Sequence, residues 1–239
     1  MTALLKVNKM TRIFGGIAAV NNVSFDVNNG DILGLIGPNG AGKSTTFNLI
    51  SGFYNLSSGK IYFDGEEVTN KKPEYLNKRQ LVRTFQHNVL FDEMTVYENI
   101  FMGTVLSKMS DKEREALILE ILETLNLSYV RDELSKNLPH GTQRMLGIGV
   151  ALATKPKLLL LDEPLTGMNM VEIREAVDVL NKLNREKNIT IVIVEHNMKA
   201  VMELCNRIVV LSYGEKIAEG TPEEVRNNEE VIRAYLGGS

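Results

Sequence analysis

The sequence of 239 residues has one cysteine, no long apolar run and no excess of basic residues. Cys205 has no second cysteine to pair with, which excludes an internal disulfide and suits a reducing compartment. We expect Cys205 to be a small buried apolar residue. No stretch approaches the ~18 apolar residues that a bilayer-spanning helix needs, and the first residues lack the charged-then-apolar order of a leader peptide. The sequence therefore predicts a chain that does not enter a membrane unaided.

The charged residues are nearly balanced, with 27 basic and 30 acidic side chains and a net charge of -3. They are spread along the chain and form no basic face, so nucleic acid is not an expected partner. No internal repeat, heptad pattern, low-complexity tract or linker is present. The length and the 44% hydrophobic content predict one α/β domain with a substantial core.

One stretch matches the phosphate-binding pattern G-x-x-x-x-G-K-[ST] without a mismatch. A short apolar run at residues 31–36 predicts a buried strand before it, and residues 44–50 predict a helix after it. Glycines in such a loop let backbone N–H groups converge on phosphate oxygens, the lysine adds a charge for the β- and γ-phosphates, and the serine hydroxyl can bind Mg²⁺. The predicted nucleotide-binding residues are Gly37, Pro38, Asn39, Gly40, Ala41, Gly42, Lys43, Ser44 and Thr45.

A second informative stretch is Leu158–Leu161, followed by Asp162, Glu163 and Pro164. Consecutive leucines predict a parallel strand buried on both faces, and the two carboxylates stand at its carboxyl end. In a nucleotide site, Asp162 would hold Mg²⁺ and Glu163 would accept a proton from the attacking water.

Two further strands end in polar residues. Residues 81–86 predict a buried strand ending at Gln86, and residues 189–194 predict another, followed by His196. An imidazole at this position can donate a hydrogen bond to a γ-phosphate oxygen. Earlier in the chain, Phe14 lies in a turn between short antiparallel strands, where it either stacks on a base or closes the end of a small sheet.

Residues 97 to about 153 differ in character because they carry helical apolar stripes and a capping box at Ser110–Glu113. Two interpretations of Met102, Leu106 and Met109 remain: they belong to the core, or they form an exposed docking surface. Capping signals also begin helices near Asn169 and Thr221.

The order of these motifs resembles the ATP-binding cassette (ABC) ATPases over essentially the whole chain. The resemblance identifies residues 37–45 as a Walker A loop, Asp162 and Glu163 as the Walker B and catalytic carboxylates, and Gln86 and His196 as the Q-loop and switch residues. It implies that Phe14 stacks on adenine, that Ser44, Gln86 and Asp162 organise Mg²⁺, and that Glu163, His196 and Gln86 serve catalysis. The D-loop would be Gly167, Met168 and Asn169.

The same resemblance implies an α/β P-loop NTPase (RecA-like) fold with a mainly parallel sheet, an N-terminal antiparallel β layer and a helical subdomain. We expect one ABC ATPase domain over residues 1–239. Residues 1–96 and 154–239 would form the β layer and core, and residues 97 to about 153 the helical subdomain. Cofactors would be ATP and Mg²⁺.

The signature motif departs from the family pattern L-S-G-G-Q. The chain has Leu138, Pro139, His140, Gly141, Thr142 and Gln143, so the leucine and second glycine remain while proline replaces the serine. Proline offers neither a hydroxyl nor an N–H to a γ-phosphate. It can serve as the first residue of a helix whose N–H groups still face the anion. The departure leads to the hypothesis that the composite ATP site using Pro139 is the weaker of two; the alternative is that this subfamily tolerates variation there.

The chain looks most like the ATPases of branched-chain amino acid importers in three segments: residues 37–50, residues 163–169 and the tail at 235–238. Lipopolysaccharide-export ATPases share much of this sequence pattern. The resemblance implies a second ABC ATPase subunit, identical or different, two transmembrane permease subunits and, indirectly, a solute-binding protein. It places the chain in the cytoplasm on the inner face of the membrane. A soluble non-transport cassette protein and a non-catalytic regulatory subunit are the competing interpretations.

Overall fold

The computed structural model describes residues 3–84 and 90–236. Within these residues, the larger sheet has six strands. Five run parallel, and the sixth, β10, is an edge strand that pairs antiparallel with its neighbour. In spatial order the strands are β10 (Glu215–Gly220), β9 (Arg207–Ser212), β3 (Ile32–Ile36), β8 (Thr190–Val194), β7 (Leu158–Asp162) and β6 (Leu81–Arg83). The mainly parallel sheet is thus confirmed.

Alternating residues of the central strands enter two separate cores. In β7, Leu158 and Leu160 join one core, and Leu159 and Leu161 join the other. Successive side chains of a strand point to opposite faces of the sheet, so a strand buried on both faces requires an unbroken apolar run. This requirement explains the leucine run, whose four members are all fully buried.

A smaller antiparallel sheet contains four strands. Its spatial order is β2 (Ile17–Val27), β1 (Leu5–Phe14), β4 (Ser58–Phe63) and β5 (Glu66–Glu67). Val23, Phe25 and Val27 of the edge strand β2 are buried, as their alternation predicts. The turn between β4 and β5 has positive φ at Asp64 (50°) and Gly65 (80°), which the right-handed twist of a hairpin favours.

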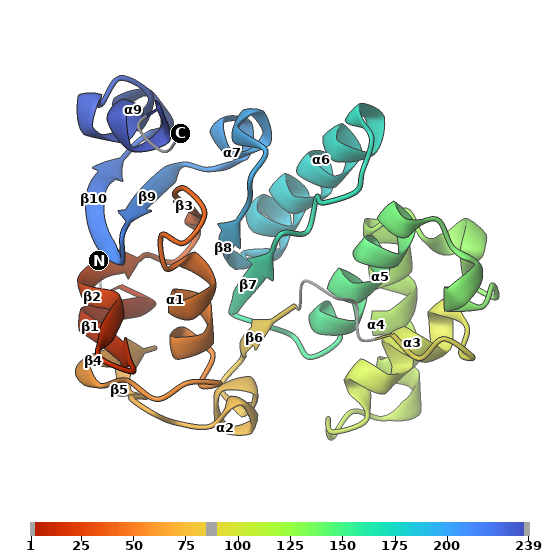
Figure 1. Cartoon of the computed structure of the whole chain (residues 1–239). Coiled ribbons are helices and arrows are strands. Elements are labelled where there is room, and N and C mark those ends of the chain that lie inside the picture. The colour runs from red at the N-terminus through yellow and green to blue at the C-terminus, as the bar shows by residue number, and fades with distance from the viewer. Residues whose placement is uncertain (1–2, 85–89, 237–239) are drawn as a thin grey trace.

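Helix α1 lies between the two sheets, whereas α6 and α7 cover the opposite face of the larger sheet (Figure 1). The helices are α1 (Lys43–Ile50), α2 (Pro73–Lys78), α3 (Val96–Thr104), α4 (Asp111–Thr124), α5 (His140–Leu152), α6 (Met170–Lys187), α7 (Met198–Leu204), α8 (Pro222–Arg226) and α9 (Glu229–Leu236), with short 3-10 turns at Ser128–Val130 and Ser135–Asn137. None of the described helices is long and apolar enough to cross a membrane.

Helices α3, α4 and α5 form a group beyond the edge strand β6 (Figure 1). The predicted capping box is present at Ser110, where the hydroxyl accepts from the Glu113 N–H and the Glu113 carboxylate accepts from the Ser110 N–H at 2.8 Å. Complete capping boxes also begin α6 at Asn169 and α8 at Thr221. Leu106 is 94% exposed, so it belongs to the surface rather than the core.

Candidate functional site

The phosphate loop connects the carboxyl end of β3 to helix α1. Gly37 has φ 152°, and a Cβ at this position would lie 2.1 Å from the Leu211 carbonyl oxygen. Gly42 has φ 98°, and a Cβ there would lie 2.6 Å from the Ala19 carbonyl oxygen. Both contacts are with rigid backbone, so only glycine fits where the loop runs between β9 and β2.

Lys43 carries a buried charge at the start of α1. Its Nζ donates to the carbonyl oxygens of Gly37 at 2.7 Å and Pro38 at 3.0 Å, and the residue is 6% exposed. Burial lowers the pKa of the ammonium, and the Glu163 carboxylate opposes this shift. The first turn of α1 contains no acidic residue, so the amino end of the helix and Lys43 together form a positive pole suited to phosphate.

Asp162 ends β7 and forms a buried ion pair. Its Oδ2 lies 2.7 Å from Nη2 of Arg83, and both side chains are less than a tenth exposed. Arg83 ends β6 and also donates to Asn48 Oδ1 at 2.7 Å and Ser51 Oγ at 3.0 Å, both on α1 or its C-cap. Arg83 therefore joins the end of strand β7 to helix α1.

Glu163 and His196 come together across adjacent strand ends. The His196 Nε2 lies 3.0 Å from Glu163 Oε1, and the Glu163 N–H donates to the Val194 carbonyl at 2.9 Å. Glu163 adopts φ 49°, a left-handed conformation that is uncommon for a non-glycine residue. The two side chains predicted to serve catalysis are thus hydrogen-bond neighbours.

Three charged residues in this region were missed by the sequence analysis: Arg83, Arg144 and Glu195. Arg144, on α5, is 7% exposed; burial lowers its pKa, and the carboxylates of Glu163, Glu195 and Asp162 oppose this shift. Arg83 and Glu195 stand at carboxyl ends of parallel strands, so the rule that selected Asp162 could have selected them too.

The segments predicted as signature motif (138–143) and D-loop (167–169) pack against each other. Pro139 is the N-cap of α5 and not, as the sequence predicted, its first helical residue, because its ψ of 149° is extended. Its carbonyl accepts a hydrogen bond from the Gln143 N–H at 3.0 Å. His140 begins the helix, and a Cβ at Gly167 would lie 2.9 Å from His140 Nδ1. Leu138 is buried, and Gln143 Nε2 donates to the Ser135 and Leu138 carbonyls.

Phe14 is 39% exposed at the end of β1, so it remains partly accessible there. Its ring meets the Tyr54 ring edge-on at 5.4 Å, and the Arg12 guanidinium lies 4.5 Å from its centroid. Gln86 lies outside the described residues.

The carboxyl-terminal helix α9 reaches the same end of the sheet. The Tyr235 hydroxyl lies 3.9 Å from the Met198 sulfur, and Met198 begins α7 directly after the His196 segment. Burial raises the pKa of the Tyr235 phenol, while the backbone of Gly37 partly offsets this shift. The tail is therefore a neighbour of the phosphate loop.

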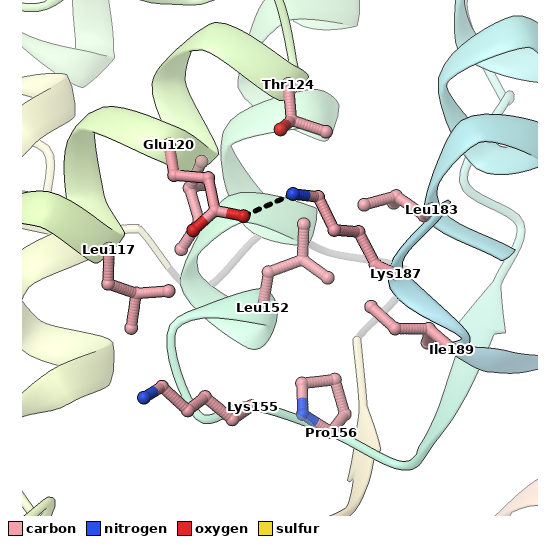
Figure 2. A pocket seen from close by; sticks show the side chains of 10 residues that line it. Leu117, Glu120, Thr124, Leu152, Lys155, Pro156, Leu183, Lys187 and Ile189 are labelled. Atoms are coloured by element: carbon pink, nitrogen blue, oxygen red, sulfur yellow. Dashed lines mark hydrogen bonds and ion pairs between the residues drawn. The ribbon is translucent and has the colours of Figure 1, made fainter. Parts of the chain in front are cut away.

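Two cavities lie away from the strand ends. One, of about 200 Å³, lies between α4, the end of α5 and the end of α6, where Lys187 pairs with Glu120 across it (Figure 2). The second, of about 440 Å³, is lined by Gly141, Thr142, Met168 and Glu172 among others. It adjoins the segments predicted as signature motif and D-loop, whereas the lining of the first contains no predicted site residue.

The fold is that of a P-loop NTPase. A family model described as "ABC transporter" matches residues 20–166, and one described as "Branched-chain amino acid ATP-binding cassette transporter" matches residues 215–239. The chain therefore belongs to the ABC transporter family, as one of its ATPase subunits.

The chain is similar to curated relatives over nearly its full length. It is 38% identical to the high-affinity branched-chain amino acid transport ATP-binding protein BraF of Pseudomonas aeruginosa and 39% identical to LivG, of the same description, from Escherichia coli, covering 98% of each chain. It is 34% identical to the lipopolysaccharide export system ATP-binding protein LptB of Haemophilus influenzae, also with 98% coverage of both. Among solved structures, the ADP conformation of the ATP-binding cassette MJ1267 superimposes with a TM-score of 0.89 at 33% identity, covering 99% of this chain and 100% of that one.

Proposed function

We propose that this chain binds ATP through residues 37–45 and hydrolyses it with Glu163 as general base and His196 as the γ-phosphate contact. The observation that carries the proposal is the 3.0 Å approach of Glu163 Oε1 to His196 Nε2. Adjacent strand ends present these two groups, and Glu163 acts electrostatically on Lys43 of the phosphate loop. A base, a phosphate-binding lysine and a hydrogen-bond donor thus converge on one region, as phosphoryl transfer to water requires.

Mg²⁺ fits the donor set of this site. The Ser44 hydroxyl in the first turn of α1 and the Asp162 carboxylate at the end of β7 are hard oxygen donors. Arg83 holds one carboxylate oxygen of Asp162 and so fixes the orientation of the other. A magnesium ion bound to ATP would neutralise charge that develops on the phosphates. We include Gln86 in this set because of its place in the family motif.

The remaining predicted residues are assigned to the interface of a dimer and to the adenine base. We propose that residues 138–143 contact ATP held by the opposing subunit, that residues 167–169 act as the D-loop, and that Phe14 stacks on adenine. Residues 97–153, which contain α3, α4 and α5, would pass the motion of closure and reopening to two transmembrane permease subunits. A relative at 28% identity, MJ0796, has been solved as a dimeric cassette.

The transported solute is proposed to be branched-chain or related amino acids, supplied by a solute-binding protein outside the membrane. The names of BraF and LivG support this assignment, and so does the match of residues 215–239 to a branched-chain transporter model. The chain would lie in the cytoplasm on the inner face of the membrane. The alternative, a lipopolysaccharide-type exporter ATPase, is supported by the likeness to LptB.

ATP hydrolysis and ATP binding test the proposal separately. Glu163→Gln removes the base but keeps the phosphate loop, so turnover should fall by on the order of 10²-fold or more while ATP binding persists. Lys43→Met should abolish the rise in melting temperature that ATP causes in the native chain. Glu175→Gln, on an exposed position of α6, is the matched control and should behave as wild type. Undiminished turnover of Glu163→Gln would contradict the assignment of the base.

A further inference from the structure

Glu195 is a buried carboxylate between two proposed catalytic residues. It directly precedes His196 at the end of β8 and is 4% exposed. Carboxylates are seldom fully buried unless donors satisfy them, because leaving water costs several kcal/mol without such partners. Two backbone N–H groups supply donors here: Leu165 N donates to Oε1 at 2.6 Å, and His196 N donates to Oε2 at 3.1 Å.

These bonds are part of a closed ring of contacts between the carboxyl ends of strands β7 and β8. The parallel ladder of β7 and β8 pairs Asp162 with Val194, and the Glu163 N–H extends it to the Val194 carbonyl at 2.9 Å. After this ladder, the Glu195 side chain joins the two segments by accepting from the N–H of Leu165, two residues after Glu163. The contact of His196 Nε2 with Glu163 Oε1 at 3.0 Å completes this ring of contacts.

A carboxylate suits this position because both of its partners are donors. Each oxygen accepts one N–H, whereas a glutamine side chain has one accepting oxygen and one donating amide. Glutamine would keep one bond and place an N–H against an N–H at the other. Burial raises the pKa of Glu195, with the Leu165, His196 and Asn197 backbone groups acting in the opposite direction.

We propose that Glu195 is a positioning residue of the ATPase site, which ties the segment after β7 to the segment after β8 and so holds Glu163 beside His196. The inference rests on the proposed function of these two residues. Both hydrogen bonds described above join Glu195 to backbone N–H groups, and its carboxylate also acts electrostatically on Arg144 of α5. Glu195 is thus placed to affect hydrolysis by holding Glu163 and His196.

The test measures ATP turnover and ATP affinity of variants in the complex that co-purifies with the tagged chain. Glu195→Ala should lower kcat by on the order of 10- to 100-fold, since small misplacements of catalytic groups have effects of this size. KM and the affinity for ATP should stay within about twofold of wild type, because the phosphate loop is untouched. Glu195→Gln should fall between Glu195→Ala and wild type. Glu203→Gln, exposed on α7, is the matched control and should be fully active.

A double-variant cycle separates positioning from a general loss of structure. Adding Glu195→Ala to His196→Ala should cost little further turnover, because both disrupt the same contact. Additive losses, wild-type kcat in Glu195→Ala, or a loss of ATP affinity that parallels the loss of kcat would each overturn the proposal. If Glu195→Ala does not fold, the isosteric Glu195→Gln is combined with His196→Ala and measured in the same way.

The proposed function of Glu163 as general base is tested in the same series of variants. Wild-type turnover in Glu163→Gln would mean that the proposed function itself is wrong. An inactive Glu163→Gln beside a fully active Glu195→Ala would contradict only the role of Glu195.

Discussion

Burial determines the chemistry of Cys205, the one cysteine of the chain. Its sulfur lies against β3, where a Cβ at Gly34 would approach it to 3.0 Å, and the residue is 6% exposed. Burial raises the pKa of the thiol from 9.0 to about 12. The small apolar role expected from the sequence is confirmed, and the thiol is protonated throughout the physiological range.

The native protein should therefore resist thiol reagents. At pH 8 we expect Cys205 to react with an aromatic disulfide reagent far more slowly in the native chain than in urea. The folded pKa exceeds the unfolded value of 9.0, so the stability contributed by the protonated thiol is complete below pH 9 and is lost as pH rises toward 12. Equal labelling rates in buffer and in urea would show that the thiol is not buried.

At the residue scale, the sequence alone can propose a site where the information is local. The phosphate loop is a continuous run, and Glu163 and His196 each follow a recognisable apolar strand. The partners of Arg83 and Glu195 could not be predicted because they are remote: Asp162 is 79 positions from Arg83, and Leu165 is 30 positions from Glu195. Such pairings depend on strand order, which apolar periodicity does not specify.

At the scale of elements, close packing of helices α3 and α5 depends on a glycine. A Cβ at Gly103 would lie 2.4 Å from the Val150 carbonyl oxygen and 2.8 Å from the Ala153 Cβ. Alanine normally favours a helix over glycine by about 1 kcal/mol. At Gly103 the backbone clash should outweigh that gain, because a carbonyl cannot move aside without shifting its helix.

Gly103→Ala should accordingly lower the free energy of unfolding, by about 1–3 kcal/mol. Gly149→Ala is the matched comparison, since its Cβ would meet only side-chain ends, at 3.0 Å from Leu125 Cδ1 and farther from two others. Those ends can adjust, so Gly149→Ala should be much less costly. Urea unfolding of both variants checks the order; a Gly103→Ala chain as stable as wild type would mean that α3 and α5 are not held this closely.

Elements were predicted well where apolar periodicity is strong. The strands predicted at residues 31–36, 158–161 and 189–194 lie within one or two positions of the observed β3, β7 and β8, because burial on both faces demands continuous apolar residues. Strand β6 is described only from Leu81 to Arg83, with one more ladder bond from Thr84 N to the Leu160 carbonyl at 3.0 Å. The exposure of Leu106 could not be predicted, because an apolar residue on a helix does not reveal whether a neighbour covers it.

At the scale of the whole molecule, the two ATP sites of a cassette dimer would be unequal if the partner is a different subunit. In our proposal each site pairs one chain's Glu163-type base with the other chain's signature helix. Helix α5 begins after Pro139, which supplies neither a hydroxyl nor an N–H. The site closed by this chain's signature would lack about one charge-assisted hydrogen bond, or ~1.5–3 kcal/mol.

The asymmetry is measured by placing the base-removing substitution in one subunit at a time. With a different partner, Glu163→Gln in this chain should remove most of the turnover, while the matching substitution in the partner removes little. A loss of ~1.5–3 kcal/mol corresponds to about 10- to 100-fold in rate, so the difference is readily measured. Pro139→Ser restores the hydroxyl and should bring the two losses closer together, since the weaker site then gains its missing donor. Equal losses in the wild-type background, unchanged by Pro139→Ser, would show that helix α5 closes its site as well with proline as with serine.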